Sequence, residues 1–323
     1  MRGKRTGTWS PDPEQMALWP EISGNTINRV GKTNNVRPTP IYWHPPEATA
    51  HGQLQTWFYK RFFSSELIRK ESEKRQVVMD EPLAPLNNEQ RKETPDTWSR
   101  LVKEKAIELS AEDVGICQIR PEWVYEDMAV QQKWAIVIAV AHDYEALKDA
   151  PEEPAAAEVV RQYGRSLKIV KDLASWIRQQ GWDAEPKSGP LAGAMLMIPA
   201  AIEAGLGELG KHGSMINRHL GSNFRIACVL TDLPLTSDKP DVFGADDFCT
   251  SCKVCSQVCP PDAISKEKQW VRGTKKWYVN FDKCLPFFNE NRACAICLAV
   301  CPWSRPGVAK NLVEKLKRRA QAT

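Results

Sequence analysis

Two runs of apolar, largely β-branched residues, Trp134–Ala141 and residues 224–230, stand out from the polar sequence around them. Runs without polar alternation are typical of strands buried on both faces of a sheet. Between them, residues 155–180 carry apolar side chains at steps of three and four, which predicts a long amphipathic helix. Gly181 is a natural end for this helix, because glycine adopts the left-handed conformation that closes many helices.

Two shorter helices are predicted near these elements. One should begin at Asp96 or Thr97, either of which can cap a first turn, and run to about Ser110. The other should cover residues 191–204 and end at Gly205. Helices that alternate with buried strands predict an α/β (α+β) core, which we place at residues 96–239.

Residues 1–95 are polar and hold ten of the 23 prolines. Proline fixes φ and lacks an N–H, so we expect an extended arm with one helical piece over residues 53–75. Aromatic side chains indicate that this arm packs on the core, as a structural wrap or as a lid over a site. These side chains are Trp43, Trp57, Phe58, Tyr59, Phe62 and Phe63.

Composition narrows the class of protein. Apolar residues make up 42% of the chain and charged residues 26%, which excludes a wholly disordered or fibrous protein. The longest apolar runs are far shorter than the about 20 residues that a membrane-spanning helix needs. The net charge is only +4 over 323 residues, so composition does not favour a nucleic-acid binder.

Eight of the ten cysteines lie within residues 249–301. Disulfide scaffolds are usually short secreted chains, and this chain is long. Its basic N-terminus has neither the apolar stretch of a secretory signal nor a twin-arginine pair. We therefore expect a cytoplasmic protein whose clustered thiolates bind metal. Cys117 and Cys228 lie outside the cluster, and Cys228, within an apolar run, is expected to be a small core residue.

The clustered cysteines form two runs of related spacing. The first is Cys249-x2-Cys252-x2-Cys255-x3-Cys259-Pro260, and the second is Cys284-x9-Cys294-x2-Cys297-x3-Cys301-Pro302. This spacing wraps a [4Fe–4S] cluster, with three thiolates on one cluster and the fourth on the next. A zinc site is the alternative, but zinc usually takes two CxxC pairs. We predict a two-cluster module at residues 240–308 and a basic helix at residues 309–323.

The two runs together resemble a bacterial two-cluster ferredoxin with crossed ligation. By that resemblance, Cys249, Cys252, Cys255 and Cys301 hold one cluster, and Cys259, Cys284, Cys294 and Cys297 hold the other. Such clusters transfer single electrons. The residues before them should supply an acceptor site, or else the whole chain is an electron carrier.

The segment before the module carries a second signal. Gly205-Leu206-Gly207-Glu208-Leu209-Gly210 has the form GxGxxG, but no strand precedes it, so we expect neither an NAD nor a flavin site. With Gly221-Ser222-Asn223-Phe224-Arg225 and Thr231-Asp232-Leu233-Pro234-Leu235, it resembles the corrinoid-dependent superfamily of reductive dehalogenases and epoxyqueuosine reductases. That resemblance implies a nitroreductase-like core that binds base-off cobalamin, with both clusters delivering electrons to Co(I).

Within the superfamily, the chain looks more like a reductive dehalogenase. Ala204-Gly205-Leu206-Gly207-Glu208, Phe243-Gly244 and the short interval from Cys284 to Cys294 carry this likeness. It implies reductive cleavage of a carbon–halogen or similarly polarised bond, with Tyr163 as the proton donor and Arg225 and Lys211 as candidate cations beside it. Cobalamin contacts are expected at Gly205, Gly207, Glu208, Gly221, Thr231 and Leu233. His142, His212 and His219 are expected to be structural rather than cobalt ligands.

Two other functions stay open at this stage. One is a tRNA-modifying enzyme similar to epoxyqueuosine reductase, and the other is a cobalamin-free electron-transfer protein with iron–sulfur clusters. For the leading hypothesis we expect a small-molecule substrate, an organohalide, and no nucleic acid. The electron donor should be a separate low-potential ferredoxin or flavodoxin.

Overall fold

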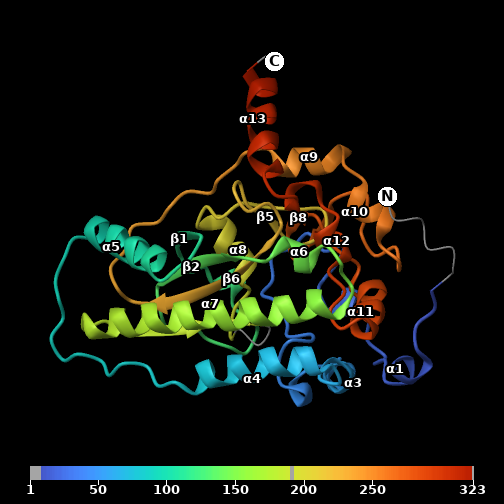
Figure 1. Ribbon diagram of the computed structural model, residues 1–323, viewed down its shortest axis with the longest axis horizontal. Coiled ribbons are helices and arrows are strands. Elements are labelled where there is room, and N and C mark those ends of the chain that lie inside the picture. The colour runs from blue at the N-terminus through green and yellow to red at the C-terminus, as the bar shows by residue number, and fades with distance from the viewer. Residues whose placement is uncertain (1–8, 190–192, 322–323) are drawn as a thin grey trace.

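The structure, a computed structural model, describes residues 9–189 and 193–321 (Figure 1). At its centre lies a four-stranded antiparallel sheet in the order β1-β2-β6-β3. The strands are β1 (Asp113–Gln118), β2 (Trp134–Ala141), β6 (Phe224–Thr231) and β3 (Ala184–Lys187). The two predicted strands are confirmed as the central pair, β2 and β6. The other two strands lie at the edges, where β3 tolerates Pro186 because it lacks a second neighbour.

The sheet is covered on both faces, which explains why the sequence of β2 shows no polar alternation. Ile136, Ile138 and Val140 lie in one apolar cluster with residues of α5 (Pro95–Glu108) and α7 (Glu153–Gln179). The alternate residues of β2, Ala135, Val137 and Ala139, lie in a second cluster with α8 (Met197–Glu203). The fold is thus a mixed α/β core with the sheet between two helical layers.

The long predicted helix is confirmed as α7, and Gly181 just after it has a φ of +84°. The cap predicted for α5 is wrong. Thr94 caps it instead, its hydroxyl accepting from the Thr97 N–H at 3.2 Å, because Pro95 fits the first helical position. The start predicted for α8 is also wrong among the described residues. Met195 forms a β-bridge with Val124, so this helix begins at Met197; residues 190–192 lie outside the described part.

The N-terminal segment carries more helix than one predicted piece. Its helices are α1 (Pro13–Ala17), α2 (Gly24–Ile27), α3 (Gly52–Phe62) and α4 (Glu66–Asp80), with a short η1 (Pro46–Ala48). The predicted piece divides at Ser65, whose hydroxyl accepts from the Ile68 N–H at 3.4 Å and starts α4. Figure 1 shows α4 alongside α7, on the side away from the sheet.

The cysteine-rich segment packs at one end of the core. Its elements are α9 (Ala245–Ser251), α10 (Val254–Val258), the hairpin β7 (Gln269–Val271) and β8 (Thr274–Lys276), α11 (Phe281–Glu290), α12 (Ile296–Ala299) and η3 (Pro302–Ser304). The last helix, α13 (Val308–Gln321), projects from this end (Figure 1). Short elements complete the core: η2 (Pro121–Trp123), α6 (Tyr144–Leu147), β4 (Glu208–Leu209) and β5 (Met215–Ile216). In the described ranges, no helix combines the length and apolar character needed to cross a bilayer.

The N-terminal segment is fastened to α11 by side-chain hydrogen bonds. The Glu290 carboxylate accepts from Trp9 Nε1 at 2.8 Å and from the Asp12 N–H at 2.7 Å, and Gln15 also donates to it. The Asp282 carboxylate accepts from the Gly24 N–H at 2.8 Å. The first helices of the chain therefore cover the helix that carries one of the predicted cluster cysteines.

Candidate functional site

One group of cysteines gathers where α9, α10 and η3 meet. Cys249 lies on α9, Cys252 at its end, Cys255 on α10 and Cys301 just before η3. Burial raises the pKa of the Cys301 thiol to about 12, and the neighbouring thiols of Cys249, Cys255 and Cys252 add to the rise. The structure thus brings Cys301 to the three cysteines with which the crossed scheme pairs it.

The second group gathers between α11 and α12. Burial raises the pKa of Cys284 to about 12, and Cys294 and Cys259 raise it further. Burial also holds the pKa of Cys297 well above its usual value, and the next largest contributions come from Cys294 and Cys284. Cys259, although it belongs to the first run of the sequence, lies near the cysteines of the second run.

Both groups have the donor set that a four-iron cluster requires. Buried thiols that raise one another's pKa exist together as thiolates only where cations compensate their charge, as the irons of a cluster do. Backbone N–H groups point at two of the sulfurs, from Lys211 to Cys249 Sγ at 3.5 Å and from Ala263 to Cys259 Sγ at 3.4 Å. In the described ranges, no group of three His, Cys, Asp or Glu side chains is placed to hold a single metal ion. A [4Fe–4S] cluster does not require such a group, because each thiolate binds a different iron.

Glu208 and Lys211 support the first group of cysteines. The Glu208 carboxylate accepts from the N–H groups of Phe243 and Ala245, both at 2.9 Å, and so fixes the start of α9. Lys211 is 2% exposed, and its ammonium donates to the Cys252 carbonyl at 2.7 Å and lies 4.8 Å from the ring centroid of Trp277. Lys211 therefore lies with the cysteines and does not accompany Tyr163, for which the sequence had suggested it as a cation.

Tyr163 of α7 lies beside the ends of the two central strands. The guanidinium carbon of Arg225, near the start of β6, is 5.0 Å from the centroid of the Tyr163 ring. His142, directly after β2, is buried, and burial followed by the nearby Arg225 charge lowers its pKa well below the ordinary value. The imidazole of His142 is therefore neutral near pH 7, whereas Arg225 brings a positive charge to Tyr163.

Several buried polar atoms at this place have no hydrogen-bond partner within the described residues. They are both ring nitrogens of His142, Oδ1 of Asn223 and Nε of Arg225. Leaving such atoms unpaired costs free energy, so a ligand with donors and acceptors is favoured here. Of the sequence-predicted catalytic residues, the structure therefore brings Tyr163 and Arg225 together.

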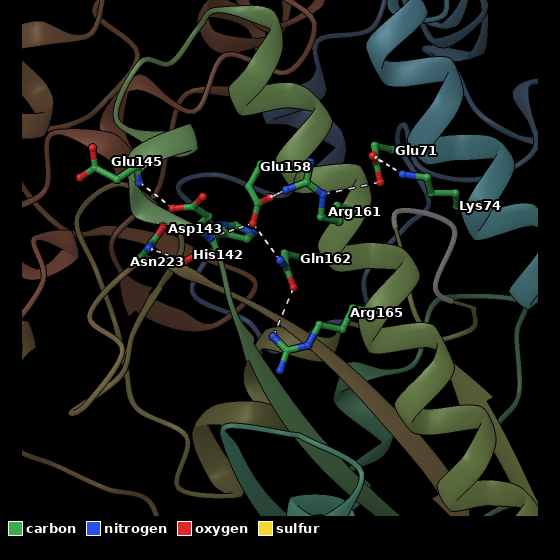
Figure 2. A network of polar contacts seen from close by, with 10 residues as sticks. All are labelled: Glu71, Lys74, His142, Asp143, Glu145, Glu158, Arg161, Gln162, Arg165 and Asn223. Atoms are coloured by element: carbon green, nitrogen blue, oxygen red, sulfur yellow. Dashed lines mark hydrogen bonds and ion pairs between the residues drawn. The ribbon is translucent and has the colours of Figure 1, made fainter.

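A polar network along α7 fixes the helix that carries Tyr163 (Figure 2). The Glu158 carboxylate accepts from the Asp143 N–H at 2.7 Å, from Gln162 at 2.8 Å and from Arg161 at 3.0 Å. Arg161 also lies 3.6 Å from the Glu71 carboxylate of α4. This network therefore links α7 to α4 through Arg161, two residues before Tyr163.

The six residues expected to contact cobalamin have partners inside the protein. Glu208 caps α9, and the Thr231 hydroxyl donates to the Asp183 carbonyl at 2.6 Å. Leu233 is fully buried in the core beside α7. A Cβ added to Gly205, Gly207 or Gly221 would meet backbone atoms of Lys239, Ile216 or Trp303, respectively. These residues shape the wall of the core, and their contact with cobalamin stays a prediction.

Four further residues near these sites, on α3, α4 and the β7–β8 hairpin, were not predicted as site residues from the sequence. Arg75 of α4 lies near two phenols, that of Tyr163 and that of Tyr59 on α3. Both phenols raise the pKa of Arg75, although burial lowers this pKa by more. On the β7–β8 hairpin, burial and then Arg272 lower the pKa of Lys276 to about 8. No motif or periodicity marks these residues, because each becomes part of a site only when distant segments pack.

Comparison with known proteins gives two kinds of match. Residues 248–304 match the 4Fe-4S dicluster domain family. A tetrachloroethene reductive dehalogenase of Dehalobacter restrictus is 34% identical over 204 residues, which is 59% of this chain and 36% of the relative. An epoxyqueuosine reductase of Leadbetterella byssophila is 29% identical over 183 residues, 48% of this chain and 55% of that protein.

Solved structures agree with the dehalogenase match. The catabolic reductive dehalogenase NpRdhA superposes with a TM-score of 0.78 at 25% identity, over 94% of this chain and 46% of that one. A second reductive dehalogenase, described with a mechanism for B12-dependent dehalogenation, gives a TM-score of 0.68 at 27% identity, over 76% of this chain and 39% of that chain. This chain thus spans about a third of the length of the curated dehalogenase and less than half of the solved ones.

Proposed function

This chain is a homologue of reductive dehalogenases, and we propose that it is a corrinoid-dependent iron–sulfur reductase that replaces a halogen on carbon by hydrogen. The observation that carries the proposal is the position of Arg225 over the ring of Tyr163, at 5.0 Å, among buried polar atoms without partners. A phenol next to a fixed cation is suited to donate a proton and to remain as the anion.

The two cysteine groups support two [4Fe–4S] clusters as the electron path. Residues 248–304 match the dicluster domain, and Cys301 and Cys259 lie with the cysteines that the crossed scheme assigns to them. Electrons would enter one at a time from an external ferredoxin or flavodoxin.

Two features fit a corrinoid in the core. The unpaired atoms of His142, Asn223 and Arg225 include donors and acceptors, which suits the amide side chains around a corrin ring. Arg272 and Lys276 are partly buried cations, and no carboxylate pairs with either among the described residues. They would hold the phosphate of the cofactor's nucleotide tail.

The reaction balances as R–X + 2e⁻ + H⁺ → R–H + X⁻. A bound corrinoid in its reduced form supplies the electrons that cleave the carbon–halogen bond. The Tyr163 hydroxyl donates the proton to carbon, and Arg225 stabilises the phenolate that remains. His142 is neutral and adds no competing charge to this site.

The test is anaerobic reconstitution of the full chain with iron, sulfide and cobalamin, followed by metal analysis and assays of halide release. Two compounds are suitable substrates. Tetrachloroethene gives its name to the Dehalobacter restrictus relative, and 3-bromo-4-hydroxybenzoic acid is bound in a solved complex of NpRdhA. We expect bound cobalt and release of halide from at least one substrate class. Iron without cobalt would overturn the proposal, and so would turnover of epoxyqueuosine in tRNA by a preparation that releases no halide.

A further inference from the structure

Arg75 is a cation beside Tyr163 that the proposed mechanism does not use. It lies on α4, where the helix packs closely on α7: a Cβ added to Gly164 would lie 3.5 Å from the Cβ of Arg75. The phenols of Tyr163 and Tyr59 are near enough to act on the pKa of Arg75, although burial, which lowers it, has the larger effect. Arg75 and Arg225 thus approach the same phenol from two different elements.

In the described part of the chain, no carboxylate neutralises either guanidinium. The Nε atoms of Arg75 and Arg225 are buried and have no hydrogen-bond partner, and no ion pair to either side chain occurs within residues 9–189 and 193–321. Both side chains are partly exposed otherwise, so a ligand can reach them. A cation held away from water without a partner is costly, and an anion bound here would offset that cost.

Two buried acidic side chains of α4 and α7 are already engaged in ion pairs. Glu71, one turn before Arg75 on α4, pairs with Lys74 at 2.8 Å and with Arg161 at 3.6 Å. Glu158 of α7 is 1% exposed and pairs with Arg161 at 3.0 Å (Figure 2). The neutral His142 adds no negative charge. The surroundings of Tyr163 are therefore positive, and this charge comes from both the arm and the core.

We propose that Arg75 binds the carboxylate of an anionic organohalide beside Tyr163, while Arg225 stays over the Tyr163 ring. This inference rests on the proposed function and names its substrate class. A guanidinium binds a carboxylate through paired N–H groups, which a neutral haloalkene cannot use. Anchoring the carboxylate would hold the carbon–halogen bond in one position relative to the Tyr163 hydroxyl. The N-terminal segment would then help to select the substrate as well as cover the core.

The test compares 3-bromobenzoate with its neutral analogue 3-bromobenzamide, titrated by calorimetry into the full chain loaded with both clusters and cobalamin. We expect the benzoate to bind about tenfold or more tightly than the amide. Arg75→Gln should abolish this preference and Arg75→Lys should retain most of it. The control Lys70→Gln removes an exposed cation of the same helix, paired with Glu66 at 2.8 Å, and should leave the preference unchanged.

Cluster absorbance and thermal melting of each variant establish that it is folded. Equal binding of benzoate and amide by the wild type would overturn the inference, as would a preference that survives in Arg75→Gln. Arg75-dependent binding of bromide without binding of benzoate would also overturn it, since the site would then serve the released halide. If both compounds release bromide at equal rates, the anion site is overturned and the proposed function stands. If benzoate binding depends on Arg75 but no bromide is released, the anion site stands and the proposed function is overturned.

Discussion

Arg225 lies over the ring of Tyr163, with its guanidinium carbon 5.0 Å from the ring centroid, although one residue belongs to β6 and the other to α7. If the Tyr163 hydroxyl donates the proton, Tyr163→Phe should lower kcat for halide release by about a hundredfold or more. Cobalt content and substrate KM should change little, because the ring is kept. Tyr144→Phe on the nearby α6 is the matched control and should keep wild-type turnover. Wild-type turnover in Tyr163→Phe would remove the proton-donor role.

The crossed arrangement of the cysteines predicts which double substitutions act together. Cys301→Ser and Cys255→Ser should damage the same cluster, so the double variant should lose about half of the iron, as each single variant does. Cys301→Ser combined with Cys297→Ser should lose both clusters, although these two cysteines are neighbours in one run. Iron analysis and the EPR spectra of the reduced proteins distinguish the two results. The opposite pattern would show ligation within each run.

Glu208 is expected to stabilise the start of α9 rather than bind a cofactor. Its carboxylate accepts three N–H groups, from Phe243 and Ala245 at 2.9 Å and from Asp246 at 3.3 Å. Glu208→Ala should lower the free energy of unfolding by about 3 kcal/mol, because two buried donors and one partly buried donor lose their acceptor. Glu208→Gln keeps the size and one acceptor oxygen and should lose less. A wild-type melting temperature in Glu208→Ala would contradict this role.

His212 should make stability depend on pH. It is buried, its Nδ1 accepts from the Ser214 N–H at 3.2 Å, and its Nε2 lies 3.0 Å from Ser222 Oγ. Burial lowers the pKa of His212 from 6.5 to about 4. Because the folded pKa is the lower one, stability is full above pH 6.5 and is lost as pH falls toward 4, by about 3 kcal/mol.

Denaturant unfolding of the wild type and of His212→Asn, at about pH 7 and about pH 4, measures this loss. Acid damage to the clusters affects both proteins, so the difference between them isolates the histidine. The variant should be less stable than the wild type at the higher pH and should lose less stability between the two values. An identical loss in both proteins would contradict the prediction.

The elements that could be predicted from the sequence are those whose pattern is complete within one segment. The central strands β2 and β6 and the helix α7 each bury enough surface to need a long apolar run or face. The edge strand β3 could not be predicted, because its four residues include Pro186 and its pairing depends on β6. The start of α8 was misplaced because a bridge between Met195 and Val124, which no local pattern reveals, interrupts the apolar run.

The candidate site divides in the same way. The cysteine runs could be predicted because a cluster fixes its ligand spacing within a short loop. Tyr163 and Arg225 could be proposed only through motif resemblance, and Lys211 was placed with them although its ammonium donates to Cys252. Arg75 escaped notice because its role depends on how α4 packs against α7.

The bonds between the first residues and α11 also bear on how the protein is made. Trp9 and Glu290 are 281 positions apart, so the N-terminal segment has no partner there until Glu290 has left the ribosome. The central sheet and the first cysteine run are complete by then. Closure of the N-terminal segment over α11 therefore follows formation of the central sheet, and this contact is a late step in folding.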